Sequence, residues 1–150
     1  MKRSPLSYAL LLLKIRERSS GELEQKMRMK KYADADISVV IKTLIEKELI
    51  NDKRFAANLV REFQEIRLSG RRKIYQKLRE RQVAPDLIEQ NLVIDKESEE
   101  TRALELANRW LKQKGSHKEK EKQYASLGRF LAGRGFDSEV VYEVLGEVFK

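Results

Sequence analysis

The residues of this sequence best suited to chemistry are the cations of its middle third. Fifteen residues starting at Arg67 hold seven lysines and arginines against one acid, Glu80. In the helix expected over 71–81, Ile74 and Leu78 share an inward face, so the basic side chains point mostly outward at helical spacing. Because arginine pairs bidentately with carboxylates and phosphates, this helix is predicted to be a binding surface. The alternative is an exposed helix whose charges pair internally with Glu80 and with the acidic segment that follows.

A second basic stretch is the lysine-rich segment 112–122, which is expected to be a loop or a solvated helix end. Contacts between lysines and the phosphates of a nucleic-acid backbone need no base sequence. The two stretches together supply the candidate residues for binding a protein or DNA partner: Arg67, Arg71, Arg72, Lys73, Lys77, Arg79, Lys112, Lys114 and Lys118.

Catalytic chemistry is not indicated by the residue types. The chain has no cysteine and one histidine, His117, which stands among lysines where a solvated side chain is expected. There is no glycine-rich phosphate loop, so most nucleophilic, metal and nucleotide mechanisms are excluded. Asp34 and Asp36 form a carboxylate pair, but the dipole at a helix start favours them as capping residues over metal ligands. We predict no enzyme activity, no cofactor and no metal site.

Two aromatic residues could stack on bases. Tyr75 lies on the basic helix, and Trp110 lies on the apolar stripe of a later helix. Stacking on aromatic rings is a common way to hold single-stranded nucleic acid. Packing in the core is the favoured interpretation for both residues.

The elements that must position these residues repeat three times along the chain. When Leu23, Ile74 and Leu127 are aligned, at spacings of 51 and 53 residues, further apolar residues fall into register four, nine, fourteen and eighteen positions later. A unit of about fifty residues cannot bury its apolar face alone, so this period indicates a stacked array. The residues in register are Met27, Leu78 and Leu131; Tyr32, Val83 and Phe136; Ile37, Ile88 and Val141; and Ile41, Leu92 and Leu145.

Each repeat is expected to hold three helices, which gives an all-α fold of nine helices without strands. Two prolines and seven glycines leave little room for the turns of an all-β protein. The predicted modules are residues 1–50, 51–96 and 97–150, and stacking them with a small rotation predicts an elongated, curved array. The expected helices are 5–17, 20–31, 35–48, 52–68, 71–81 and one from Pro85 toward Ile94, followed by three more around Trp110, Leu127 and Val141.

Capping residues predict where several helices begin and end. Ser4 is expected to cap the first helix, with Pro5 at its first position. Ser19 and Glu22 match a capping box at the start of the second helix. The expected caps of later helices are Asp34, Asn51 or Asp52, and Asp137, and the expected helix stop is Gly135.

Charge and composition indicate where the protein works. The net charge of +8 favours contact with a charged polymer or an acidic protein. The basic start followed by a short apolar run is interrupted by Lys14, so neither a signal peptide nor a membrane span is expected. Without cysteines, a reducing environment suits the chain. We expect a soluble, cytoplasmic monomer that makes no membrane contact.

Several segments resemble the RecX family of recombinase regulators. The central one runs from Leu49 to Ala56, includes Asp52 and Arg54-Phe55-Ala56, and is followed by Ser69-Gly70 and a basic helix with Ile74 and Leu78. In this chain Asn51 stands where the family usually has the first acid of a pair, Leu68-Ser69-Gly70 is less glycine-rich than the common form, and Gln82-Val83 replaces a frequent glycine at the end of the basic helix. The resemblance extends over about residues 8–146; its outer segments are Ala9 to Leu23 and Arg134-Gly135-Phe136.

The resemblance implies three tandem three-helix units and a regulator of the recombinase RecA. Such a protein is expected to bind in the groove of the RecA–DNA filament and to restrain filament growth, ATP hydrolysis and strand exchange during recombination, DNA repair and the SOS response. An alternative from the charges alone is a sequence-independent nucleic-acid-binding module that contacts single- or double-stranded DNA. A third hypothesis is that the chain is a helical scaffold that binds some other acidic protein.

Overall fold

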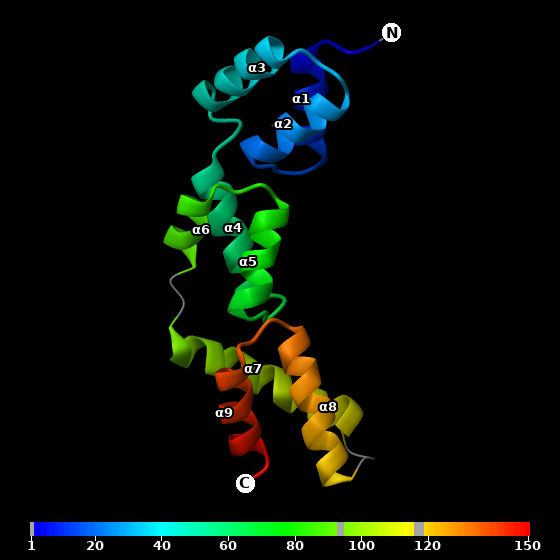
Figure 1. Cartoon of the computed structure of the whole chain (residues 1–150), viewed down its shortest axis with the longest axis vertical. Coiled ribbons are helices and arrows are strands. Elements are labelled where there is room, and N and C mark those ends of the chain that lie inside the picture. The colour runs from blue at the N-terminus through cyan, green and yellow to red at the C-terminus, as the bar shows by residue number, and fades with distance from the viewer. Residues whose placement is uncertain (1, 93–94, 116–118) are drawn as a thin grey trace. The chain divides into compact units, whose positions relative to one another are not determined.

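The computed structural model describes residues 2–92, 95–115 and 119–150, and every regular element in these residues is helical (Figure 1). The all-α prediction is therefore confirmed. The elements are α1 (Pro5–Ile15), α2 (Ser20–Met29), α3 (Asp34–Glu46), α4 (Asp52–Glu65), α5 (Arg71–Glu80), α6 (Pro85–Asn91), α7 (Lys96–Trp110), the π-helical turn η1 (Leu111–Gly115), α8 (Lys120–Gly133) and α9 (Ser138–Val148).

The chain forms two compact units whose boundaries cut through α4 and α5. One unit holds residues 1–58 and 77–91, and the other holds residues 59–76 and 92–150. The tandem three-helix plan is present, but each unit combines one terminal module with part of the middle one. The elongation and curvature expected for the array, and module boundaries at residues 50 and 96, stay predictions.

Local sequence explains the start of the first two helices as predicted. The Ser4 hydroxyl accepts a hydrogen bond from the Ser7 N–H at 3.2 Å, and Pro5 opens α1. At the start of α2, the Ser19 hydroxyl accepts from the Glu22 N–H and the Glu22 carboxylate accepts from the Ser19 N–H. This capping box satisfies two of the backbone N–H groups at the start of α2 that have no partner within the helix.

The later caps differ in part from the prediction. Asn51 caps α4 by accepting from the Arg54 N–H at 3.0 Å. Asp34 is the first residue of α3 instead of its cap, which is Ala33 without a side-chain hydrogen bond. Asp137 holds the cap position of α9, but its side chain caps no N–H group. Its carboxylate forms ion pairs elsewhere, as described below.

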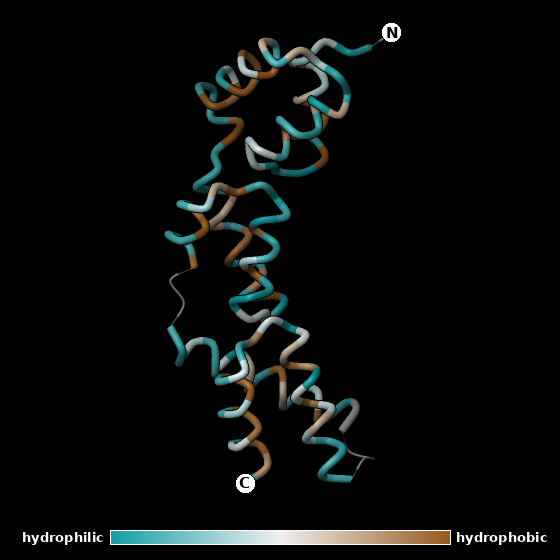
Figure 2. Tube along the Cα trace, in the orientation of Figure 1, coloured by the Kyte–Doolittle hydropathy of each residue, from teal (hydrophilic) through white to brown (hydrophobic). Residues whose placement is uncertain are grey.

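The residues in repeat register form the interior. Leu23, Ile74 and Leu127 are fully buried, as are the three residues four positions later. Of the remaining nine, Tyr32 and Leu92 are half-buried and the others are buried. Hydrophobic burial at equivalent positions is what holds each module together, and Figure 2 shows the apolar and polar residues alternating along the helices.

The second helix of every module ends in the same way. Lys31, Gln82 and Gly135, each eight residues after the aligned position, have φ values of 64°, 60° and 94°. The next residue donates its N–H back to the helix in all three: Tyr32 to Met27, Val83 to Leu78 and Phe136 to Leu131. This is a Schellman motif, in which a left-handed residue satisfies the last carbonyls of a helix. Gly135 is thus the predicted stop.

Helix α4 ends three residues earlier than predicted, at Glu65. Leu68 takes a left-handed φ of 49°, and the Ser69 N–H donates to the Phe63 carbonyl at 2.8 Å. The turn places the Leu68 side chain in the buried cluster formed by α7, α8 and α9. A tertiary contact therefore sets this helix end.

Trp110 is 8% exposed within that cluster, so the prediction of a core role is confirmed. Tyr75 is 42% exposed, so the expected core packing of Tyr75 is wrong. The segment expected as a loop or frayed end begins with η1, which continues α7 by one wider turn. His117 and Lys118 lie outside the described residues. Among the helices described, none has the length and apolar character to cross a membrane.

Candidate binding surface

Two similar contacts, which we call joints, connect the second helices of successive modules. The turn after α5 contacts the start of α2, and the turn after α8 contacts the start of α5. In the first contact, the Ser19 hydroxyl donates to the carbonyl of Arg81, which directly precedes the left-handed Gln82. Glu22, 7% exposed, forms ion pairs with Arg16 and with Arg81, the latter at 3.5 Å. A Cβ on Gly21 would lie 2.6 Å from the Gln82 carbonyl oxygen, so the two backbones meet without space for a side chain.

The second contact uses the equivalent positions fifty residues on. The Gly70 N–H donates to the Arg134 carbonyl at 2.8 Å, and the Arg72 N–H donates to the Gly135 carbonyl at 3.0 Å. Gly70 stands four residues before Ile74, as Ser19 stands four before Leu23. The repeat therefore reproduces the joint as well as the module.

A buried acid strengthens this second joint. Glu99, 4% exposed, accepts from the Arg71 N–H at 2.7 Å and pairs with the guanidinium of Arg102. Arg102 also donates to the Ser98 hydroxyl at 2.7 Å and to the Ser69 carbonyl at 3.4 Å. Burial raises the pKa of the Glu99 carboxyl, opposed by the Arg71 N–H and the Arg102 charge. The acid fixes the first turn of α5, where the basic helix begins.

The basic residues gather around this joint. We call Arg67, Arg71, Arg72, Lys73 and Arg134 the basic junction. The Arg72 guanidinium donates to the carbonyls of Phe136 at 2.7 Å and Ala132 at 3.1 Å. Asp137 forms ion pairs with Arg71 at 3.5 Å and with Arg72 at 3.4 Å. Two of the predicted binding residues are thus partly engaged in holding α5 to the corner between α8 and α9.

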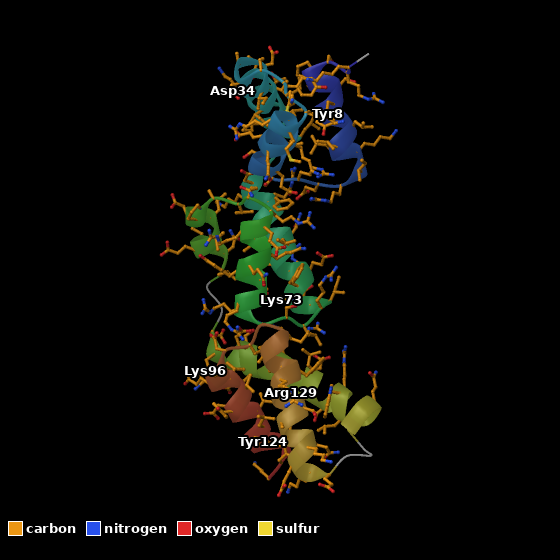
Figure 3. All side chains as sticks on the ribbon, turned by 45° about the vertical axis from the view of Figure 1, so that its right-hand side comes forward. Tyr8, Asp34, Lys73, Lys96, Tyr124 and Arg129 are labelled. Carbon is orange, nitrogen blue, oxygen red and sulfur yellow. The ribbon has the colours of Figure 1, made fainter. Side chains whose placement is uncertain are left out.

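The other three cations of the basic junction, Arg67, Lys73 and Arg134, add positive charge to this surface. The Arg67 guanidinium lies 4.9 Å from the centre of the Phe63 ring, and its carbonyl accepts from Arg134. Lys73 is exposed, and among the described residues it forms no ion pair. Figure 3 labels Lys73 on α5 and Arg129 on α8. A phosphate or carboxylate of a partner finds charge-assisted donors here.

The remaining candidates are less concentrated. Lys77 is half-buried and pairs with Glu80 at 3.5 Å, so the internal partner expected from the sequence is present. Arg79 is exposed, and it lies with Lys77 in the first unit. Lys112 is exposed on η1. Lys114 lies in η1 but its side chain is outside the described part, as is the whole of Lys118.

Sequence reasoning missed Arg134 and Arg129 as candidate residues. Arg134 lies over the Phe130 ring at 5.8 Å, and Arg129 lines a shallow hollow on α8 with Lys122 and Ser126. The repeat register could have found Arg134, because it is equivalent to Arg81, a member of the basic stretch that starts at Arg67. Arg129 stands between residues in register and gave no such signal.

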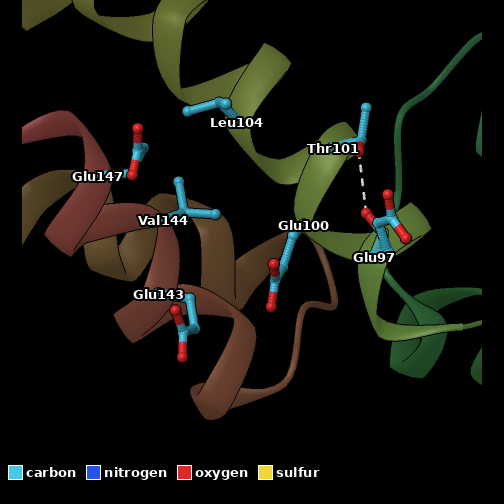
Figure 4. A pocket seen from close by; sticks show the side chains of 7 residues that line it. All are labelled: Glu97, Glu100, Thr101, Leu104, Glu143, Val144 and Glu147. Carbon is cyan, nitrogen blue, oxygen red and sulfur yellow. Dashed lines mark hydrogen bonds between the residues drawn. The ribbon is translucent and has the colours of Figure 1, made fainter.

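Acidic side chains line a pocket between α7 and α9 (Figure 4). Its volume is about 230 Å³, and its apolar lining residues are Leu104 and Val144. In the part of the chain that the structure describes, no group of three potential metal ligands is close enough to hold an ion. The carboxylates around the pocket are those of Glu97, Glu100, Glu143 and Glu147.

Comparison with known families matches each module separately. Residues 6–44 match the first three-helix domain of RecX, residues 51–92 the second and residues 97–145 the third. The matches follow one another in order over most of the chain.

Similar proteins carry the same name. The chain is 33% identical to regulatory protein RecX of Vibrio parahaemolyticus, covering 89% of this chain and 84% of that one. It is 31% identical to regulatory protein RecX of Prosthecochloris aestuarii, covering 97% and 94%. The Thermotoga maritima protein of that name is 30% identical, covering 97% and 85%.

Solved structures support the fold. The crystal structure of RecX from Lactobacillus salivarius matches with a TM-score of 0.80 at 24% identity, covering 95% of this chain and 93% of that one. A second crystal structure of regulatory protein RecX matches with a TM-score of 0.80 at 23% identity, covering 95% and 71%. At these identities the likeness shows the architecture alone.

Proposed function

Because the chain belongs to the RecX family of regulatory proteins, we propose that it regulates RecA. It acts on the RecA–DNA filament and restrains filament growth, ATP hydrolysis and strand exchange in recombination, DNA repair and the SOS response. It acts by binding, as a cytoplasmic protein without catalytic chemistry of its own. The observation that carries the proposal is the ordered match of all three modules to this family.

The joints between modules are suited to this task. A partner that is itself a repeating polymer offers the same contact at regular spacing, and a chain of quasi-equivalent modules offers repeated elements in return. Glycines in close backbone contact and paired acids fix the two joints, as at Gly70 and Glu99. The basic junction then stands at a defined place around the start of α5, available to phosphates or to acidic side chains.

The proposal is tested by ATP hydrolysis. Purified chain is titrated into RecA on single-stranded DNA, from well below equimolar to equimolar amounts. We expect hydrolysis to fall progressively, because filament that is lost or blocked no longer turns over ATP. A charge-matched basic protein of similar size serves as the control. Hydrolysis that stays unchanged over this range contradicts the proposal.

The second candidate function is direct, sequence-independent binding to nucleic acid. The observation that favours it is the basic junction, where Arg67 and Lys73 are exposed and Arg134 is half-buried beside them. Phosphate contacts make affinity fall steeply with salt. Titration of naked DNA over a salt series separates the two functions: tight binding without RecA supports this module, and weak binding supports the regulator.

A further inference from the structure

One helix of the first unit is apolar on the face that its own module does not cover. Ala9 and Leu12 of α1 are buried against α2 and α3. On the other side, Leu6, Leu10, Leu11 and Ile15 are 39%, 41%, 37% and 68% exposed. We call these four residues with Lys14 the outer α1 face. No other helix in the described residues exposes more than two large hydrophobic side chains.

The spacing makes the outer α1 face continuous. Leu6, Leu10 and Lys14 follow at four-residue steps along one ridge, and Leu11 and Ile15 form the neighbouring ridge. A helix that is apolar all round is normally buried on all sides. Contiguous exposed apolar surface of this kind marks an interaction site. The face therefore belongs in contact with another surface.

The charge on this face indicates the chemistry of the surface it meets. Lys14 is the only charged residue of α1, and it ends the ridge that Leu6 and Leu10 begin. A DNA backbone offers phosphates to Lys14 but no apolar area to the leucines. A helix lying on a membrane needs a basic polar face opposite its apolar one, whereas the opposite face of α1 is the module core. An apolar protein groove with a carboxylate opposite Lys14 satisfies both features.

We propose that the outer α1 face is the protein-docking surface of the chain, and that it lies in an apolar groove with an acidic rim on a RecA protomer. In this binding mode a helix lies in a groove of its partner and contacts it through side chains four positions apart. This proposal rests on the proposed function, since RecA supplies the partner. It separates the tasks along the chain: the first module holds protein, and the basic junction meets phosphates or acidic side chains.

The test compares two double variants with the same change in polarity. Leu10→Gln with Leu11→Gln removes the centre of the outer α1 face. Val39→Gln with Ile45→Gln, at positions 65% and 51% exposed on α3, removes comparable apolar surface from the same module. Circular dichroism melting establishes that both variants fold. Affinity is then measured for RecA filaments on single-stranded DNA, for naked single-stranded DNA and for anionic phospholipid vesicles.

We expect the α1 variant to bind the filament at least ten-fold more weakly than the wild-type chain, while the α3 variant binds it within two-fold. Both variants keep the wild-type affinity for naked DNA. Lys14→Glu weakens filament binding as well, whereas Lys14→Arg does not. This pattern supports the docking surface.

Three results overturn it. Wild-type binding of the filament by the α1 variant contradicts the docking surface while leaving the proposed function intact. Vesicle binding that disappears in the α1 variant without any change in filament affinity assigns the face to a membrane surface instead. A wild-type chain that neither binds the filament nor lowers its ATP hydrolysis contradicts both proposals together.

Discussion

Gly70 and Gly135 meet so closely that a Cβ on Gly70 would lie 2.4 Å from the Gly135 carbonyl carbon. The two residues are 65 positions apart, and their contact joins the start of α5 to the corner after α8. A glycine is needed at Gly70 because the neighbouring atoms are backbone and cannot turn aside.

Gly70→Ala is therefore expected to lower the free energy of unfolding by about 1–3 kcal/mol, as overpacking of a tight contact does. The measurement is urea unfolding followed by circular dichroism. Gly146→Ala is the matched control, because Gly146 lies in the last turn of α9 and an added Cβ there meets nothing within 4 Å. The control is expected to raise stability by about 0.5–1 kcal/mol. Equal effects of the two changes would argue against the close contact.

The Schellman corners predict opposite effects of two further substitutions. Gln82 has a left-handed φ of 60°, which a glycine adopts without strain. Gln82→Gly is expected to raise the free energy of unfolding by roughly 0.5–1 kcal/mol, because relief of the left-handed strain exceeds the added entropy of a glycine in the unfolded chain. Gly135→Ala lowers it, because φ is 94° and the added Cβ would lie 2.4 Å from the Lys73 Cβ. Thermal melting of both variants checks the pair of signs, and a destabilised Gln82→Gly variant contradicts the account of the corner.

Glu99 is expected to make stability depend on pH. Its carboxyl has a raised pKa in the folded chain because it is buried, against about 4.3 for an exposed glutamate. The fold thus favours the protonated form. The resulting contribution to stability is complete below about pH 4.3 and is lost as pH rises through the raised pKa.

Glu99→Gln tests this dependence, because glutamine keeps a carbonyl oxygen that accepts from the Arg71 N–H. The free energy of unfolding of both proteins is measured from pH 4 to pH 8. We expect the difference, wild type minus variant, to decrease as pH rises. A difference that grows with pH would mean that the Arg102 charge outweighs burial at Glu99.

Arg72 and Lys73 are neighbours with separable roles. Arg72 donates to two carbonyls of the corner between α8 and α9, so Arg72→Ala is expected to destabilise the fold by about 1–3 kcal/mol. Lys73→Glu leaves the Gly135 contact of the Lys73 Cβ in place and reverses an exposed charge. It is expected to weaken binding to RecA filaments or DNA several-fold with little loss of stability.

Stability is measured by urea unfolding and binding by fluorescence anisotropy of labelled DNA, alone and coated with RecA. Lys42→Glu on α3, also exposed, controls for the change in net charge. If Lys42→Glu and Lys73→Glu weaken binding equally, the loss comes from the change in net charge, and the basic junction is not a specific binding surface.

The module plan could be predicted from the sequence because it depends on local periodicity. Leu23, Ile74 and Leu127 recur with their helical neighbours, and burying them requires no knowledge of distant contacts. The cap at Ser19 and the stop at Gly135 are likewise set by side-chain chemistry within a few residues.

What could not be predicted depends on contacts between distant segments. Arg72 looks like a solvent-facing cation until the Phe136 carbonyl, 64 residues away, is placed beside it. Glu99 reads as one of several exposed acids until Arg71 and Arg102 surround it. Leu68 was expected to continue a helix, yet its turn places it in the core of the third module.

The outer α1 face illustrates a different limit. A stripe of leucines at helical spacing predicts burial, and Leu12 is buried as expected. The same periodicity does not say whether the rest of the stripe meets the chain's own core or a partner, because both are apolar. Only the exposure of Leu10 and Leu11 in the structure shows that this part of the stripe does not pack in the chain's own core.

The central claim, that the chain restrains the RecA filament, is tested most directly by the growth of single filaments. Fluorescent RecA is assembled on tethered DNA, and the extension rate of each filament is recorded before and after the chain is added. We expect extension to slow or stop at chain concentrations below that of RecA, and to slow less with the Leu10→Gln, Leu11→Gln variant. Extension at an unchanged rate with the wild-type chain would contradict the account.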